Sequence, residues 1–171
     1  MFVWICIVIG AVYLDQITKW LAVIFLQGNP PVPFIDWFIR FTYLENRGAA
    51  WGMLSDHRWV FMVLSTVAII AVTLYVFIAK PKDPLLRVSL AFITAGGIGN
   101  MIDRVFLGYV VDFFEFTFID FPVFNVADSF VCIGAAMLIL YFVIDVIKDY
   151  KNGKQKADTS VGDGGRGGDE A

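Results

Sequence analysis

Four long apolar runs constrain the fold of this chain more than any other feature of its sequence. A bilayer core about 30 Å thick is crossed by about 20 helical residues, and each run has roughly that length. Hydrophobic residues make up 58% of the 171 positions, more than a soluble domain of this size needs. We therefore predict an all-α membrane protein with four transmembrane helices, at about Phe2–Phe25, Trp59–Ala79, Leu85–Ile102 and Ser129–Ile147.

Basic segments predict the orientation of these spans. The short loop KPKDPLLR joins the second and third runs, and the tail after the fourth run begins KDYKNGKQK. Cytoplasmic loops carry an excess of Lys and Arg, so both segments are predicted to be cytoplasmic. The N-terminus is then cytoplasmic too, and the longer connections at 26–58 and 103–128 face outward. The first run is expected to be a retained span, because it contains Asp15 and Lys19 and lacks a basic leading segment.

The two outer connections do not have the composition of ordinary linkers. Residues 33–44 and 110–124 mix aromatic residues with alternating polar ones, which is typical of short strands at the membrane interface and also of an aromatic belt. A short amphipathic segment is expected after Asn46. We predict a four-helix domain over residues 1–150. Residues 151–171, rich in Gly, Asp and Ser, are predicted to be a disordered cytoplasmic tail.

Composition argues against several classes of function. The net charge of −3 does not suggest a nucleic-acid partner. Cys6 and Cys132 lie in separate apolar runs without a metal-binding spacing, and His57 lies in a polar turn. We therefore expect neither a metal nor a cofactor.

Charged residues inside or at the ends of spans are expensive, so they usually face a partner or a site. Asp15 and Lys19 are four residues apart and share one helix face. They could form an ion pair, belong to a substrate site, or do both. Gly96, Asn100 and Arg104 also repeat every four residues, which indicates either one wall of a site or polar contacts between helices. Asp103 is placed to accept a hydrogen bond from another helix.

Two further carboxylates, Asp112 and Asp128, bracket the second aromatic segment. Asp128 precedes the fourth run, so a role as helix N-cap would explain it in isolation, and Asn125 could have a related role one turn earlier. An N-cap does not explain Asp112. Both ends of the segment lie near the outer surface, so the two acids can meet. Two partly buried carboxylates share one proton, and such a pair activates water without a metal. A Ser129–Lys19 dyad is the alternative chemistry, without supporting spacing.

Five motifs, taken in order, resemble one family. DQITK, ENRGAAWG, GGIGNMIDR, VVDFF and FNVADS are similar to the motifs of the bacterial lipoprotein signal peptidases, the type II signal peptidases. The resemblance covers roughly Asp15 to Ser129. Trp51 stands where the family usually has phenylalanine, and Arg47 falls on a variable position.

The resemblance implies a membrane aspartyl endopeptidase. Members of the family remove the signal peptide of diacylglyceryl-modified prolipoproteins just before the lipidated cysteine. Asp112 and Asp128 would be catalytic, and the substrate-binding or supporting residues would be Asp15, Lys19, Asn46, Gly48, Asn100, Arg104 and Asn125. The implied location is the bacterial inner membrane, with the site near its outer face. The implied partners are lipidated prolipoproteins, membrane lipids and the family inhibitor globomycin, and we expect a monomer.

Two other classes of function stay open from the residues alone. A small transporter or proton-coupled channel would use Asp15, Lys19, Asn100 and Arg104 as a relay, although no internal repeat supports it. A non-catalytic assembly factor would use the aromatic loops as an interface. Cleavage of a lipidated prolipoprotein by the purified protein separates both from the peptidase.

Overall fold

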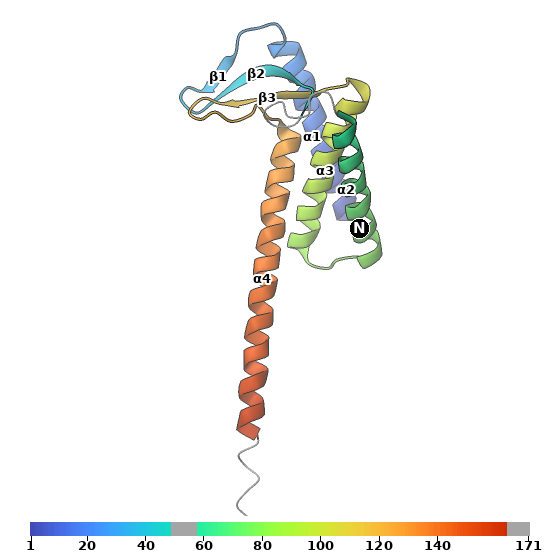
Figure 1. Ribbon diagram of the computed structural model, residues 1–171, viewed down its shortest axis with the longest axis vertical. Helices are drawn as coiled ribbons and strands as arrows, with labels where there is room; N and C mark the ends of the chain where they lie inside the picture. The colour runs from blue at the N-terminus through green and yellow to red at the C-terminus, as the bar shows by residue number, and fades with distance from the viewer. Residues whose placement is uncertain (49–57, 164–171) are drawn as a thin grey trace, which may run out of the picture.

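The computed structural model describes residues 1–48 and 58–163, and its architecture is four helices with one small sheet. The helices are α1 (Phe2–Leu26), α2 (Arg58–Ala79), α3 (Pro84–Phe106) and α4 (Val126–Asp163). The strands β1 (Val32–Ile35), β2 (Ile39–Asn46) and β3 (Val110–Phe116) form an antiparallel sheet. In Figure 1 this sheet lies across one end of the helices, and the α2–α3 connection lies at the opposite end of α2 and α3.

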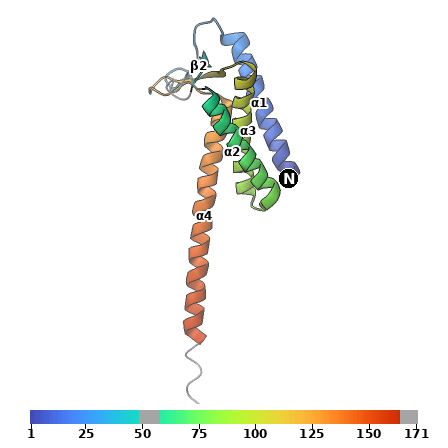
Figure 2. The same ribbon diagram turned by 45° about the vertical axis from the view of Figure 1, so that its right-hand side comes forward.

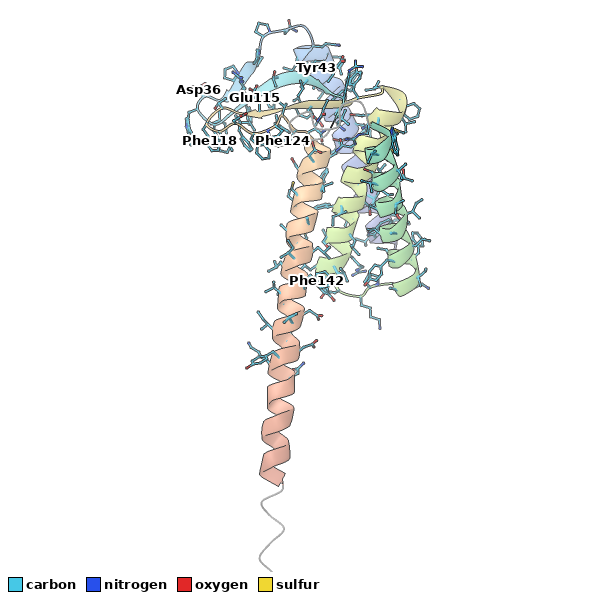
Figure 3. All side chains as sticks on the ribbon, in the orientation of Figure 1. Asp36, Tyr43, Glu115, Phe118, Phe124 and Phe142 are labelled. Atoms are coloured by element: carbon cyan, nitrogen blue, oxygen red, sulfur yellow. The ribbon has the colours of Figure 1, made fainter. Side chains whose placement is uncertain are left out.

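All four helices are long and apolar enough to cross a membrane, as the sequence predicted. In α2 and in the first part of α4, only 6% of the most apolar stretch is buried inside the protein. Large apolar side chains such as Ile78 on α2 and Phe142 on α4 are exposed; Figure 3 shows Phe142 on α4 at a distance from the sheet. Exposed apolar side chains of this extent are compatible with contact to lipid. The helices can face lipid because each satisfies its own backbone hydrogen bonds.

The third helix is the centre of the bundle. Half of its apolar stretch is buried, and it packs against α1, α2 and α4. Ala91 and Ala95 are fully buried beside Trp4 and Val8 of α1. Small residues on this face let the helix backbones approach closely. In lipid the hydrophobic effect does not drive helices together, so their association depends on such close packing.

Gly96 lies where α3 approaches α4 closely. A Cβ atom at this position would lie 2.3 Å from the carbonyl oxygen of Ala127 and 2.6 Å from Cγ2 of Val131. Gly96→Ala is therefore expected to displace the first turn of α4, costing about 1–3 kcal/mol of stability. Gly10→Ala on α1 is the matched control, because a Cβ there meets nothing within 4 Å. Thermal unfolding in detergent should show a lowered Tm only for Gly96→Ala, and equal Tm values would contradict the packing.

The sheet positions the loop that precedes α4. In the β2–β3 register Leu44 lies opposite Asp112 and Asn46 lies opposite Val110. Phe124, just before α4, forms an isolated bridge with Phe114 of β3. Figure 3 shows Phe118 toward the far end of the sheet and Phe124 nearer the start of α4. The strands expected within residues 33–44 and 110–124 are confirmed, and they hold the start of α4 against β3.

Two boundaries differ from the sequence prediction. Helix α3 runs to Phe106 rather than ending near Ile102, so Asp103 and Arg104 are helical. Residues 151–163 were expected to be disordered, whereas α4 continues to Asp163, and Figure 2 shows it extending past the other helices. The amphipathic segment expected after Asn46, with Trp51, and residues 164–171 lie outside the described residues.

Candidate active site

Asp112 lies on β3 with only 1% of its surface exposed, between buried Val111 and Phe113. Its Oδ2 accepts a hydrogen bond from Nδ2 of Asn46 at 2.8 Å, and its Oδ1 accepts one from Nδ2 of Asn125 at 2.6 Å. The backbone N–H of Gly48 donates to Oδ1 of Asn46 at 3.0 Å. This bond orients the Asn46 amide, so that its NH₂ group faces Asp112.

The environment of Asp112 favours its neutral form. Burial raises the pKa of Asp112 to about 7, and the negative charge of Asp128 contributes to the increase. Hydrogen bonds from Asn46 and Asn125 and the charge of Lys19 oppose it. Near neutral pH this carboxyl group therefore exchanges its proton readily, as a general acid requires.

Asp128 lies in the first turn of α4, and its carboxylate completes the start of that helix. Oδ1 of Asn125 accepts from the backbone N–H of Asp128 at 2.9 Å, while Oδ2 of Asp128 accepts from the backbone N–H of Asn125 at 3.2 Å. This reciprocal arrangement is a capping box with Asn125 as the N-cap. The interpretation of Asp128 as the N-cap is therefore wrong. Asp128 is half-buried, unlike Asp112.

Two asparagines join the acids into one hydrogen-bonded cluster. Asn125 is fully buried and contacts both carboxylates, through its amide to Asp112 and through its backbone N–H to Asp128. Asn100 on α3 donates from Nδ2 to Oδ1 of Asp128 at 2.7 Å. Its own Oδ1 accepts from Nδ2 of Asn125 at 3.1 Å. Residues from α3, β3 and α4 therefore converge on the two acids.

Asp15 and Lys19 form the ion pair that their spacing indicated. Nζ of Lys19 lies 3.0 Å from Oδ2 of Asp15 and 3.0 Å from Oδ2 of Asp103. Lys19 also donates to Oδ1 of Asn100 at 2.9 Å, which connects the pair to the acid cluster. Oδ1 of Asp15 accepts from the backbone N–H of Ala127 at 2.8 Å. A buried ion pair costs desolvation, and these additional hydrogen bonds offset part of that cost.

Arg104 lies on the same stripe of α3 as Gly96 and Asn100. Its Nη1 donates to the carbonyl oxygen of Asn100 at 3.4 Å, and the charge of the half-buried guanidinium interacts with those of Asp128 and Asp112. The predicted stripe thus faces the acid cluster, with Gly96 packed below it against Ala127.

Sequence reasoning missed Gln16, which lies between Asp15 and Lys19 in the chain. Its Nε2 donates to Oδ2 of Asp15 and to Oδ1 of Asp103, each at 3.1 Å. The expectation that Asp103 accepts a hydrogen bond from another helix is confirmed by this contact. A polar side chain inside an apolar run was the available signal.

Other chemistries find less support in the geometry. Oγ of Ser129 donates to the carbonyl oxygen of Asn125 at 3.0 Å, while Lys19 is engaged with Asp15, Asp103 and Asn100, so no Ser129–Lys19 dyad is assembled. Across residues 1–48 and 58–163, no group of three or more His, Cys, Asp or Glu side chains is placed to hold a metal ion.

Comparison with known proteins decides the family. Residues 7–144 match the family model described as signal peptidase (SPase) II. The chain belongs to the signal peptidase II family. The family named from the five sequence motifs is thereby confirmed, and a peptidase is favoured over a transporter or an assembly factor.

Individual relatives agree with this assignment. A lipoprotein signal peptidase of Caldanaerobacter subterraneus subsp. tengcongensis is 50% identical over 135 residues, which are 78% of this chain and 91% of that protein. One from Bacillus pumilus is 43% identical over 77% of this chain and 86% of its own. A bacterial membrane enzyme solved by the in meso method at 2.3 Å resolution has a TM-score of 0.78 and 31% identity, covering 85% of this chain and 90% of that one.

Proposed function

We propose that this chain is an aspartic endopeptidase of the bacterial inner membrane that removes the signal peptide from diacylglyceryl-modified prolipoproteins. Asp112 and Asp128 are the catalytic acids. The observation that carries the proposal is the convergence of these two carboxylates on Asn125, one fully buried and one half-buried. The names of the relatives support the substrate class.

The unequal environments of the acids assign their roles. Asp112, the more buried acid with a pKa of about 7, holds the shared proton and donates it to the carbonyl oxygen of the scissile peptide. Ionised Asp128 takes a proton from a water molecule, whose oxygen attacks the carbonyl carbon. Asp128 then passes this proton to the leaving nitrogen as the C–N bond breaks. The proton on the carbonyl oxygen returns to Asp112, which restores the pair.

Arg104 supplies positive charge beside the reaction. Its guanidinium already interacts electrostatically with both acids, so it counters negative charge that develops on the attacked carbonyl. Asn46, Gly48, Asn100 and Asn125 hold the two carboxylates, while Asp15 and Lys19 support them from α1.

The sheet is the proposed contact with the membrane surface and the substrate. Phe34 and Trp37 are 63% and 73% exposed, as aromatic residues at a membrane interface are. Lys80 and Lys82 lie in the α2–α3 connection, at the end opposite the sheet in Figure 1. With that basic end and both termini in the cytoplasm, the site is at the outer face, where a lipidated substrate enters from the bilayer. We further propose that the protein acts as a monomer and binds globomycin at this site.

Cleavage of a lipidated prolipoprotein by the purified protein in detergent tests the proposed function. We expect one cut, just before the lipidated cysteine, and no cut in the same prolipoprotein without its diacylglyceryl group. Extended chelation and dialysis should leave turnover unchanged. Activity that disappeared on chelation and returned with zinc or magnesium would contradict the aspartic mechanism.

Turnover is expected to fall as the pH rises above neutrality. The mechanism requires a proton on Asp112, whose pKa is about 7 in the substrate-free protein, so kcat/KM should decrease by roughly tenfold per pH unit well above that value. Initial rates at substrate concentrations well below KM, between pH 4 and 10, measure this profile. A flat profile from neutral to alkaline pH would contradict the assignment of the proton.

A further inference from the structure

Lys19 contacts two carboxylates that hold different parts of the backbone around the acids. Asp15 accepts from the backbone N–H of Ala127 at 2.8 Å, and Ala127 immediately precedes Asp128. Asp103 accepts from the backbone N–H of Val111 at 3.1 Å, and Val111 immediately precedes Asp112. Nζ of Lys19 lies 3.0 Å from a carboxylate oxygen of each.

We infer that Asp103 is a positioning residue for the reaction and that, with Asp15 and Lys19, it fixes the placement of Asp112 relative to Asp128. This inference rests on the proposed function of those two acids. Asp103 secures the strand that carries one acid, and Asp15 secures the helix that carries the other. We call Asp15 and Asp103 the two anchors. Lys19 contacts both and so connects β3 with α4.

The contacts of the two anchors are matched. Each carboxylate accepts from the Lys19 ammonium, from the Gln16 amide and from one backbone N–H. Asp15, Lys19 and Asp103 are at most 3% exposed, so solvent does not weaken these interactions. The arrangement leaves little freedom to the peptide units before Asp112 and Asp128.

Lys19 also sets the orientation of Asn100. Because Oδ1 of Asn100 accepts from Lys19 at 2.9 Å and from Asn125 at 3.1 Å, its Nδ2 faces the opposite way and donates to Asp128 at 2.7 Å. The same ammonium therefore acts on the acids by three routes, through Asp15, Asp103 and Asn100.

A residue that only held helices together would change stability and leave the turnover of folded protein unchanged. Displacing a catalytic group slightly lowers kcat instead, because the reacting atoms are no longer aligned, while ground-state binding is little changed. We expect Asp103→Ala to lower kcat by about 10- to 100-fold with KM within about threefold of the original value. Asp103→Asn should recover much of this loss, because an amide oxygen still accepts from Val111.

The experiment measures kcat, KM and Tm with a lipidated prolipoprotein for Asp103→Ala, Asp103→Asn and Asp112→Asn. Thr94→Val is the matched control on the same helix. Thr94 is 1% exposed, and its Oγ1 lacks a hydrogen-bond partner within the described part of the chain, so this variant should keep the original kcat. If Asp103→Ala does not fold, Gln16→Met is used in its place. Gln16→Met removes one hydrogen-bond donor from Asp15 and one from Asp103 but changes no charge, and we expect it to lower kcat several-fold.

The outcomes separate this inference from the proposed function. A lower kcat with nearly constant KM, recovered in Asp103→Asn, supports the positioning role. An unchanged kcat in folded Asp103→Ala or Gln16→Met, an effect on KM alone, or an equal loss in Asp103→Asn would overturn it while Asp112→Asn stays inactive. Turnover by Asp112→Asn would instead overturn the proposed function itself.

Discussion

Asp112→Asn and Asp128→Asn are each expected to abolish cleavage, with kcat lower by roughly 100- to 10,000-fold. Asparagine has nearly the shape of aspartate but neither holds nor releases the shared proton. The double variant should be little worse than either single one, because two residues that act as a unit are disabled by either change. Turnover of a lipidated prolipoprotein by each purified variant measures the effect.

The fold should survive both substitutions. In Asp128→Asn the new amide oxygen still accepts from the backbone N–H of Asn125, which preserves the capping box. Glu115→Gln is the matched control on β3, because Glu115 pairs with Arg40 at 2.7 Å and takes no part in the acid cluster. It should retain full activity. Full activity of Asp128→Asn would contradict the catalytic role of Asp128 and leave it only its part in the capping box.

Asn125→Ser is expected to give the second large loss, lowering kcat by about 10- to 100-fold while α4 keeps an N-cap. Serine is a good N-cap, so α4 still begins correctly. The shorter side chain, however, no longer donates to Asp112 as the Asn125 amide does at 2.6 Å. Asp112 then loses a bond that holds it beside Asp128.

Asn125→Ala separates the two roles of this residue. It should match the kcat of Asn125→Ser but lose about a further 1 kcal/mol of stability, because alanine does not cap the helix. Thermal unfolding and turnover on the same preparations compare them. If Asn125→Ser kept the original kcat, the amide bond to Asp112 would have no part in the reaction.

The spans were predictable from sequence because a run of about 20 apolar residues has few other solutions. The position of Asp128 in its helix was harder, because both Asn125 and Asp128 have side chains that suit an N-cap and only the backbone hydrogen bonds distinguish them. Helix α4 continues through residues 151–163, beyond the fourth apolar run, and the apolar pattern does not indicate this extension.

The meeting of Asp112 and Asp128 came from the family resemblance rather than from spacing. Their approach depends on the pairing of β3 with β2 and on the bridge between Phe114 and Phe124, which are long-range contacts with no local pattern. The contact of Asp103 with the backbone of Val111 is of the same kind. The periodicity of α3 placed Gly96, Asn100 and Arg104 on one face, since a helix fixes such spacing locally.

The protonation state of Asp112 tests the central claim most directly. Carboxyl carbons labelled with ¹³C in aspartate can be followed by NMR as the pH is raised, with Asp112→Asn used to assign the signal. We predict that the Asp112 signal titrates with a pKa of about 7 and that this pKa falls in Asp128→Asn, because the neighbouring negative charge is gone. An Asp112 carboxyl that is already ionised at pH 5, or whose pKa is unchanged in Asp128→Asn, would contradict the shared proton.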